Sequence, residues 1–288
     1  MPFSRITSLT NPKIKKAVRL RASKERQAQG VTIVEGDKEI SRALEGKVFF
    51  QEVYVCTELF AGTGEACLAG REAASRRLLL DRLAASQISI YETTKAVFSK
   101  IAYGDRQEGI LAVCKTPRHS LADMRFKGIP LLVVVEGVEK PGNLGAILRT
   151  CDGAGVNGMI VCDPKTDLYN PNVIRASLGT IFSVPTIVSS SAEAFDFLKS
   201  KGVMVCAASP QAQDVYTRVS LKGPLAVVVG SEDEGLSDFW MKNSDLQVKI
   251  PMRGCADSLN VSASAAILIY EALRQRGIKN VITQFPSL

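Results

Sequence analysis

Polar residues that could bind a ligand follow three separate apolar segments of the chain. The apolar runs 131–135 and 225–229 and the alternating run 247–250 each lead into a polar loop that contains glycine. The side chains suited to hydrogen bonding or proton transfer in and just after these loops are Asn143, Arg149, Glu232, Ser258 and Asn260. Because the carboxyl ends of parallel strands meet at one edge of a sheet, we expect these residues to form a single site.

The third loop leads into a helix that we predict over 259–276. Asp257 and Ser258 are residue types that cap helix N-termini, and arginines occupy the expected last turn. The first turn is small and polar, and a helix N-terminus presents free backbone N–H groups to a ligand. A capped helix packed on a sheet through small residues would explain this segment equally well by itself. The recurrence of the pattern at three junctions favours a binding site.

Alternating apolar segments predict an α/β fold in two parts. In residues 1–115 we predict strands at 31–34, 48–56, 88–91 and 109–114, and helices at 11–29, 37–44, 71–85 and 93–100. Residues 116–127 are predicted to be a linker. In residues 128–288 we predict strands at 131–135, 159–162, 184–188, 203–207, 225–229 and 247–250, and helices near 143–152, 171–179, 191–200, 236–241 and 259–276. Strands separated by helices predict a parallel sheet covered on both faces.

The composition argues against several classes of protein. The 288-residue chain is 46% apolar, and no apolar run approaches the roughly 20 residues that span a bilayer. Its first residues lack the apolar segment of a signal peptide. The seven cysteines contain no CxxC pair, and Cys151, Cys162 and Cys206 lie in apolar segments that predict core positions. With His119 as the single histidine, we expect no metal, no membrane and a reducing, cytoplasmic location.

The net charge of +7 is concentrated at one end of the chain. Residues 1–30 contain eight basic residues and one acid, Glu25, whereas the remaining residues balance to zero. A dense basic segment favours a phosphate backbone, and a solvated helix face is the alternative. The basic residues of the first predicted helix that we expect to contact nucleic acid are Lys13, Lys15, Lys16 and Arg19.

Common nucleotide-binding loops do not explain the three junctions. The chain contains neither G-x-G-x-x-G nor G-x-x-x-x-G-K-[ST]. The segment Gly62-Thr63-Gly64 follows a predicted strand but lacks a third glycine, and we interpret it as a surface loop.

In order and spacing, the three junctions resemble the three sequence motifs of the SpoU/TrmH branch of the SPOUT RNA methyltransferases. The matching segments are 143–150 (NLGAILRT), 230–236 (GSEDEGL) and 250–262, which contains IPM and DSLNVS. The resemblance covers residues 129–276. More loosely, 34–36 (VEG) and 107–110 (QEGI) resemble the substrate-binding domain of ribosomal-RNA members of this branch.

The resemblance implies an enzyme that transfers a methyl group from S-adenosylmethionine to a ribose 2′-hydroxyl of RNA, with large-subunit ribosomal RNA preferred. It implies a homodimer, a small α/β RNA-binding domain at 1–115, and a SPOUT domain at 128–288 whose cofactor lies in a trefoil knot. The alternatives are a tRNA 2′-O-methyltransferase and a non-catalytic RNA-binding or ribosome-assembly factor on the same scaffold. Ribosome maturation and antibiotic resistance are both compatible with the implied activity.

The family motifs also imply roles for the residues of the site. A ribose hydroxyl is a weak nucleophile that must lose its proton as it attacks a sulfonium methyl. In the family, the arginine that matches Arg149 is proposed as the base, helped by an RNA phosphate. Because arginine hardly deprotonates, a bidentate clamp on phosphate is the alternative role. Asn143 would cap the helix or bond the substrate, Glu232 would bond Asn143 and the loop backbone, and Ser258 and Asn260 would cap and position.

For the cofactor, the adenine requires backbone amides and an apolar slot. The candidates are Ala207, Ser209, Gly230, Ile250, Met252, Leu259 and Asn260. Glycine at 230 would let the backbone approach the ligand, whereas core packing is the alternative for Met252. Arg175 is a further candidate for RNA or for the cofactor carboxylate, and a solvated helix residue is its alternative. Arg149 and Arg175 thus join the basic residues of the first helix as expected RNA contacts.

Overall fold

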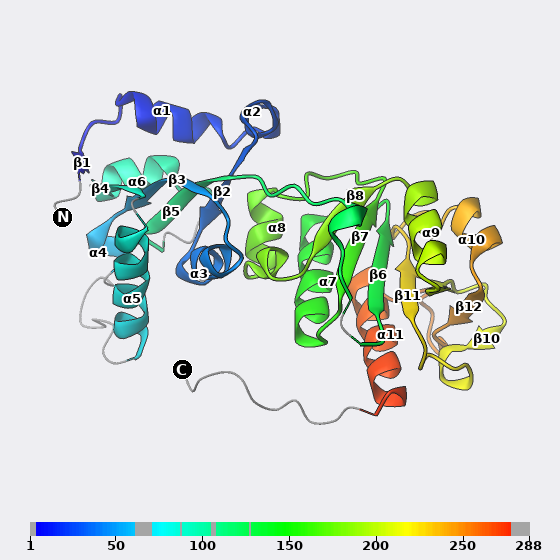
Figure 1. The fold of residues 1–288 in the computed structure, drawn as a ribbon. Coiled ribbons are helices and arrows are strands. Elements are labelled where there is room, and N and C mark those ends of the chain that lie inside the picture. Colours follow the sequence, from blue (N-terminus) through cyan, green and yellow to red (C-terminus); the bar gives the residue numbers. More distant parts are fainter. Residues whose placement is uncertain (1–3, 61–70, 87, 105–107, 127, 278–288) are drawn as a thin grey trace. The chain divides into compact units, whose positions relative to one another are not determined.

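The computed structural model describes residues 4–60, 71–86, 88–104, 108–126 and 128–277. The predicted loop at 62–64 and Gln107 of the 107–110 motif lie outside these ranges. The described residues form two compact units (Figure 1). One contains the residues up to Pro117 together with Tyr169–Phe182, and the other contains Arg118–Leu168 and the residues from Ser183 on. Within the described ranges, no helix has the length and apolar character that crossing a membrane requires.

The first unit is built on a five-stranded mixed sheet. Its strands lie in the order β1–β4–β3–β5–β2. β1, β4 and β3 pair in parallel, whereas β5 pairs antiparallel with both β3 and β2. The strands are β1 (Ser4–Ile6), β2 (Val31–Glu35), β3 (Phe50–Val55), β4 (Ser89–Thr93) and β5 (Ile110–Lys115). All four strands predicted for this part are present, and the short β1 extends one edge.

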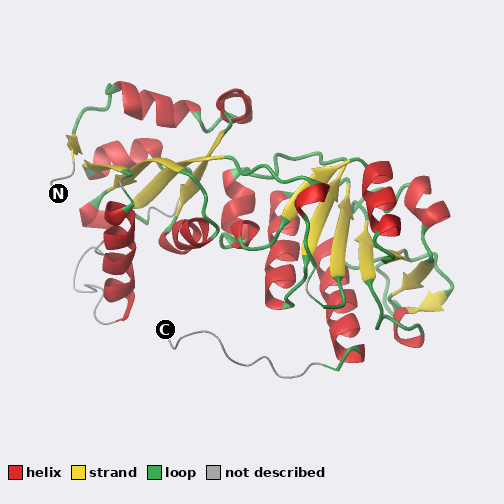
Figure 2. Ribbon diagram, viewed as in Figure 1, coloured by secondary structure: helices red, strands yellow, loops and turns green. Residues whose placement is uncertain are grey.

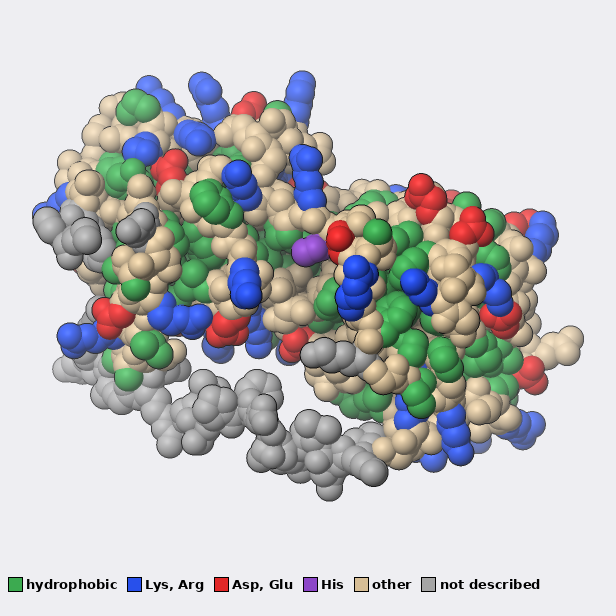
Figure 3. Space-filling view, in the orientation of Figure 1, with side chains coloured by type: hydrophobic (Ala, Val, Ile, Leu, Met, Phe, Trp, Pro, Cys, Tyr) green, Lys and Arg blue, Asp and Glu red, His purple; other side chains and the backbone are tan. Residues whose placement is uncertain are grey.

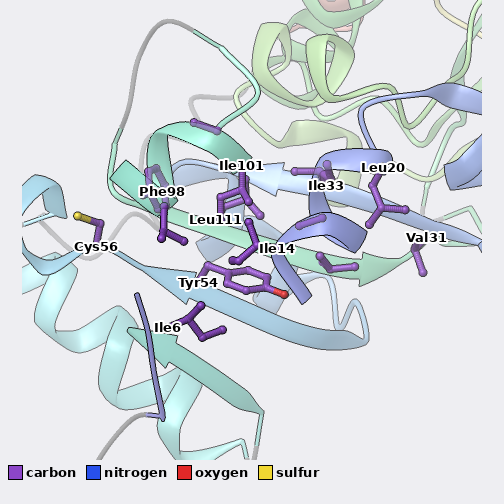
Figure 4. Close-up of a cluster of buried hydrophobic side chains, with 14 residues drawn as sticks. Ile6, Ile14, Leu20, Val31, Ile33, Tyr54, Cys56, Phe98, Ile101 and Leu111 are labelled. Atoms are coloured by element: carbon purple, nitrogen blue, oxygen red, sulfur yellow. The ribbon is translucent and has the colours of Figure 1, made fainter. Parts of the chain in front are cut away.

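Helices cover both faces of this sheet, with α1 and α6 over one face and α3 and α5 over the other (Figures 1 and 2). The helices are α1 (Pro12–Arg19), α2 (Ser23–Gln29), α3 (Asp37–Glu45), α4 (Thr57–Phe60), α5 (Arg71–Ala85) and α6 (Lys95–Ile101). Between α1, α6 and the sheet lies a cluster of buried side chains that includes Ile14, Tyr54, Phe98 and Leu111 (Figure 4). The apolar spacing of α1 therefore serves this core, and its remaining side chains face outward.

The predicted helix over 11–29 is wrong in one respect, because the chain forms two helices there. The break falls at Leu20–Ala22, where Ala22 adopts an extended backbone with ψ 130° before α2 begins. The buried guanidinium of Arg26 donates hydrogen bonds to the carbonyls of Leu20 and Arg21 at 3.0 and 2.8 Å. These bonds satisfy acceptors that the interrupted helix leaves free.

A segment from the second half of the chain folds with the first unit. This segment, Tyr169–Phe182, contains the elements α8 (Pro171–Ala176) and η2 (Thr180–Phe182). The hydroxyl of Thr32 donates to the carbonyl of Tyr169 at 2.7 Å, and the guanidinium of Arg42 donates to the carbonyl of Leu178. The compact units therefore differ from the predicted domains 1–115 and 128–288 in this segment.

The second unit contains a seven-stranded sheet in which every pairing is parallel, as the alternation of strands and helices predicts. The strands lie in the order β10–β12–β9–β11–β6–β7–β8. They are β6 (Leu131–Glu136), β7 (Gly158–Cys162), β8 (Thr186–Ser189), β9 (Met204–Ala208), β10 (Asp214–Val215), β11 (Leu225–Val229) and β12 (Leu246–Lys249). The two-residue β10 was not predicted, because it is too short for a periodic pattern.

Helices on both faces bury this sheet. The elements are η1 (Leu121–Asp123), α7 (Pro141–Gly153), α9 (Ser191–Ser200), η3 (Tyr216–Arg218), α10 (Asp238–Asn243) and α11 (Val261–Gln275). Alternate strand residues such as Leu132 and Val134 pack with Leu198 of α9 and Trp240 of α10. On the other face, α11 packs against α7 and β11. The central strands are therefore buried on both sides, as their continuous apolar runs predict.

The chain crosses back over the sheet after β12. Strand β12 is separated from β11 by β9, yet the next helix, α11, packs on β11 and α7. The loop 250–260 therefore passes the carboxyl ends of β9 and β11. The trefoil knot that the resemblance implies stays a prediction.

Candidate active site

A cleft of about 420 Å³ lies at the carboxyl ends of β9, β11 and β12. Its walls are formed by residues 208–211, residues 229–236 and several residues between 241 and 264. The second and third predicted junctions therefore meet at one sheet edge, together with the loop after β9. Such an edge is where open parallel sheets bind ligands.

The loop 230–237 folds back on itself directly after β11. Ser231 and Gly235 exchange two backbone hydrogen bonds at 3.0 and 3.1 Å, and Gly235 has φ 70°. A Cβ atom at Gly230 would collide with the carbonyl oxygen of Gly235. Glycine is thus required at both positions, at one for close approach and at the other for left-handed backbone. The tight fold places loop backbone along the cleft wall.

Three side chains join all three predicted junctions. The amide of Asn143, on α7, donates to Oε1 of Glu232, in the loop after β11. The amide of Asn260 donates to the same oxygen at 3.0 Å and lies 3.2 Å from Oδ1 of Asn143. The predicted hydrogen bond between Glu232 and Asn143 is therefore present. We call Asn143, Glu232 and Asn260 the junction cluster.

Asn260 caps α11, which begins at Val261 and not at residue 259 as predicted. Its Oδ1 accepts from the backbone N–H of Ser262 at 3.0 Å and from the hydroxyl of Ser262 at 2.6 Å. Ser258 lies before this cap and lines the cleft. Of the two predicted caps, Asn260 fills the role and Ser258 does not.

Lys140 adds an ion pair to the junction cluster. Its Nζ lies 2.6 Å from Oε2 of Glu232, and this hydrogen-bonded pair raises the pKa of the Lys140 ammonium. Both carboxylate oxygens of Glu232 therefore have donors, and its side chain is only 22% exposed. Lys140 was not predicted from the sequence; its position three residues before Asn143, beside the helix start, was the available signal.

Arg149 lies on the same helix as Asn143, six residues further along. At 100° and 1.5 Å per residue, it sits about 120° around the helix and about 9 Å along its axis from Asn143. Its side chain is exposed and forms no hydrogen bond or ion pair with any residue that the structure describes. Within the described part of the chain, nothing therefore competes with an anionic ligand for this guanidinium.

Glu136, at the end of β6, anchors the far end of the loop 230–237. Its carboxylate accepts from the N–H and the hydroxyl of Ser237, both at 2.7 Å, and from the hydroxyl of Ser191 at 3.2 Å. The indole N–H of Trp240 donates to that same Ser191 hydroxyl at 3.1 Å. Glu136 is 8% exposed and does not line the cleft. Glu136 was not predicted from the sequence, because it directly follows the apolar run 131–135, which predicts a core strand.

Most of the predicted cofactor residues line the cleft: Ser209, Gly230, Ile250, Met252 and Leu259. Ala207 is fully buried within β9 between its pairing partners on β11 and β12, and its neighbour Ala208 lines the cleft, so a contact of Ala207 with the cofactor stays a prediction. Asn260 is not among the lining residues, because its side chain turns toward Glu232.

The lining suits the cofactor that the resemblance implies. Leu236, Ile250, Met252 and Leu259 provide apolar surface for an adenine ring. The backbone of 230–235 and the polar side chain of Gln211 provide hydrogen-bonding groups. This combination of an apolar slot with a few polar groups is typical of small-molecule sites.

The basic residues of α1 divide into two kinds. Lys13 and Lys16 lie 3.5 and 3.8 Å from the carboxylate of Glu52 on β3, so they are partly neutralised. Lys15 and Arg19 are exposed and have no ion pair with the described part of the chain. Lys and Arg side chains project from the surface over α1 and α2 (Figure 3).

Arg175 lies on α8 and belongs to the first unit, and it is not among the residues that line the cleft. A Cβ atom at Gly104 would collide with its guanidinium. Its charge also opposes the rise in the pKa of Glu35 that burial causes. The role of Arg175 as a cofactor contact therefore has no support from its position, and its role as an RNA contact stays a prediction.

Comparison with known proteins matches both parts of the chain. The profile of the SpoU rRNA Methylase family matches residues 130–270, and that of the MRM3-like substrate binding domain matches residues 11–112. The 23S rRNA (guanosine-2′-O-)-methyltransferase RlmB of Shewanella oneidensis is 34% identical over 215 residues, which are 73% of this chain and 87% of the relative. The 23S rRNA (guanosine(2553)-2′-O)-methyltransferase RlmP of Bacillus subtilis is 28% identical over 268 residues, 93% of this chain and 98% of the relative.

Solved structures share the fold over nearly the whole chain. A crystal structure of an RNA 2′-O ribose methyltransferase is 39% identical with a TM-score of 0.78, covering 94% of this chain and 99% of that one. The SpoU methyltransferase AviRb from Streptomyces viridochromogenes, in complex with the cofactor AdoMet, is 25% identical with a TM-score of 0.79 and covers 92% and 99%.

Proposed function

The chain belongs to the SpoU rRNA methylase family, and from this premise we propose that it transfers the methyl group of S-adenosylmethionine to a ribose 2′-hydroxyl of large-subunit ribosomal RNA. The observation that carries the proposal is the junction cluster beside the cleft. Asn143, Glu232 and Asn260 come from three distant segments, and their hydrogen bonds hold the three loops together at one sheet edge. The names of the relatives, which are 23S rRNA 2′-O-methyltransferases, support the substrate.

The cofactor would bind in the cleft, between the folded loop 230–235 and the apolar residues of 250–259. When bound, S-adenosylmethionine supplies a methyl group on a sulfonium, so the protein must position a ribose oxygen and let its proton leave. We assign Arg149 to a phosphate next to the target ribose, because its guanidinium has no partner among the described residues and is suited to bidentate contact. The hydroxyl proton then passes to water. Glu232 keeps Asn143 and Asn260 in place, and Lys140 balances its charge.

We infer that the first unit contacts the RNA through α1. Lys15 and Arg19 are exposed there without an ion pair to any described residue, and the match to a substrate binding domain over 11–112 supports this role. A ribosomal RNA substrate also supports the cytoplasm as the location, because ribosomes are assembled and used there in bacteria such as those of the relatives.

We propose a homodimer that uses the surface shared by α7 and α11. The two helices pack together, and the hydroxyl of Tyr270 lies within 3.4 Å of where a Cβ of Gly153 would be. Tyr270 is 46% exposed, and the small or apolar residues Ala146 of α7 and Ala266 and Ile267 of α11 are partly exposed. Light scattering on the purified protein should give the mass of two chains, and the mass of one chain would contradict the proposal.

Mapping of 2′-O-methyl marks tests the function directly. RNA from cells with and without the protein should differ at a nucleotide of large-subunit ribosomal RNA, and purified protein with S-adenosylmethionine should restore the missing mark. A mark lost from transfer RNA alone, or no lost mark, would contradict the proposed substrate. Calorimetry with S-adenosylmethionine tests the cofactor separately, because the cleft should bind it without RNA.

A further inference from the structure

Phe49 exposes more of its surface than any other large hydrophobic residue that the structure describes. It lies immediately before β3 and is 61% exposed. Single exposed hydrophobic side chains are common and need no explanation by themselves. The surroundings of the ring therefore decide whether it has a role.

A lysine ammonium lies over the Phe49 ring. Nζ of Lys115, at the end of β5, is 5.0 Å from the ring centroid, and the backbone N–H of Lys115 donates to the Phe49 carbonyl at 2.8 Å. A cation at this distance is attracted by the face of an aromatic ring. The strand pairing thus fixes the two residues side by side, with both side chains at the surface.

The sheet register shows on which face this pair lies. Lys115 is directly opposite Val31 of β2 and follows Val113 by two residues, so its side chain emerges on the same face as theirs. Val31 and Val113 belong to the cluster under α1 and α6 (Figure 4). The ring of Phe49 therefore lies on the face of the sheet that carries α1.

Two ammonium groups of α1 pair with a carboxylate of β3, the strand that Phe49 precedes. The carboxylate of Glu52 forms ion pairs with Lys13 and Lys16 of α1. In the sheet, Glu52 is opposite Val113, which lies two residues before Lys115 on β5. At a rise of 3.4 Å per residue, the two positions are about 7 Å apart along the strand. An exposed aromatic face with ammonium groups beside it is the combination that binds unpaired bases together with their phosphates.

We propose that Phe49 is a stacking platform for an unpaired base of the RNA substrate and that Lys115 and Lys16 contact its flanking phosphates. A single strand or a hairpin loop fits this site, because in a duplex the base faces are covered by their neighbours. The inference rests on the proposed function and specifies how the first unit recognises its substrate.

The test measures binding of a short single-stranded RNA of mixed sequence, and of the same sequence as a blunt duplex, by fluorescence anisotropy. The change Phe49→Ala should weaken single-strand binding about 5-fold to 150-fold, the effect of losing one stacked base. Phe49→Trp should restore it, whereas Phe49→Leu should not. Duplex binding should change little. At saturating RNA, kcat of the alanine variant should equal that of the wild type, with the loss appearing in KM.

Leu78 provides the matched control, because it is 60% exposed in the same unit on α5, which covers the opposite face of the sheet. Leu78→Ala should leave RNA binding unchanged. Lys115→Gln should reduce the slope of log K against log salt by about 0.7, whereas Phe49→Ala should leave the slope unchanged. Equal single-strand affinity of wild type and Phe49→Ala would overturn the inference. If the wild type methylates no ribosomal RNA, the proposed function fails instead.

Discussion

At the scale of single residues, Arg149 is the sharpest test of the chemistry. We expect Arg149→Ala to lower kcat/KM about 100-fold or more, because a substrate that is misplaced by even a small distance reacts much more slowly. The fold should be intact, since the side chain is exposed and bonds to none of the described residues. Arg218→Ala, which also removes an exposed arginine of the second unit, should keep full activity. A fully active Arg149→Ala enzyme would remove this residue from the site.

The change Arg149→Lys separates the two roles considered for this residue. Lysine keeps the positive charge but loses the bidentate fork and has a lower pKa. If Arg149 clamps a phosphate, the variant should be slower at every pH with an unchanged profile shape. If Arg149 accepts the proton, the rising limb of the pH–rate profile should move to lower pH. Single-turnover rates measured across pH distinguish these outcomes.

At the scale of elements, the loop 230–237 depends on a carboxylate outside the cleft. Glu136→Gln removes the charge that binds Ser237, and hydrogen bonds to charged groups are worth about 1.5–3 kcal/mol each. We expect the Kd for S-adenosylmethionine to rise about 10-fold to 100-fold, because the loop must be ordered again on binding. Isothermal titration calorimetry measures this change.

Glu193 supplies the control for Glu136. It also accepts hydrogen bonds from a serine at the start of α9, namely from the N–H and hydroxyl of Ser190 at 3.2 and 2.8 Å. It makes no hydrogen bond to the loop 230–237 in the described structure. Glu193→Gln should therefore lower thermal stability slightly with an unchanged Kd. Equal cofactor affinity of the Glu136→Gln variant and the wild type would show that the loop does not depend on this anchor.

The start of α3 should make stability depend on pH. Burial raises the pKa of Glu39 from 4.5 to about 7, and the nearby carboxylates of Glu108 and Asp37 add to the rise. Between these pH values the folded protein holds a proton that the unfolded chain has lost, so stability falls as pH increases through this window. Glu39→Gln stays neutral, and its advantage in Tm over the wild type should grow from pH 4.5 to 7 and then level off.

Glu45→Gln is the control on the same helix, because the Glu45 side chain is 62% exposed, whereas Glu39 is buried. The Tm of the Glu45→Gln variant relative to the wild type should not increase between pH 4.5 and 7. A constant difference for Glu39→Gln would mean that Glu39 ionises in the folded protein as it does in the unfolded chain.

Helices and strands could be predicted from the sequence where the local hydrophobic pattern determines them. The strands at 131–135 and 225–229 match β6 and β11 closely, because central parallel strands are continuous apolar runs. The break between α1 and α2 was not predictable, since no glycine or proline marks it and Arg26 stabilises it through its own hydrogen bonds. Asn260 was a predicted cap, but two earlier residues of equally good capping type placed the predicted helix start too early.

At the scale of the whole molecule, long-range contacts set the limit of what the sequence could predict. The three loops were expected to meet, and the junction cluster joins them. The hydrogen bond from Thr32 to Tyr169, across 137 residues, assigns Tyr169–Phe182 to the first unit, and no periodic pattern carries such information. Glu136 and Lys140 were missed for the same reason, because their partners Ser237 and Glu232 follow far along the chain.

The charge distribution of the whole chain leads to a final prediction. The excess of +7 lies in residues 1–30, whereas the residues that form the cleft come from the balanced remainder. Replacing Lys15 and Arg19 by glutamine should therefore weaken RNA binding, and should lower the slope of log K against log salt by about 1.4, or about 0.7 per lost phosphate contact on a single strand. S-adenosylmethionine binding should not change.

The same double change at Lys13 and Lys16 should have a smaller effect, because Glu52 already neutralises part of their charge. Arg218→Gln with Lys222→Gln removes two exposed charges from the second unit and should leave the slope unchanged. If all three double variants lowered the slope equally, binding would follow net charge alone and α1 would have no special position. If only the change at Lys15 and Arg19 lowers it by the expected amount, then α1 brings the RNA to the protein while the balanced second unit performs the transfer.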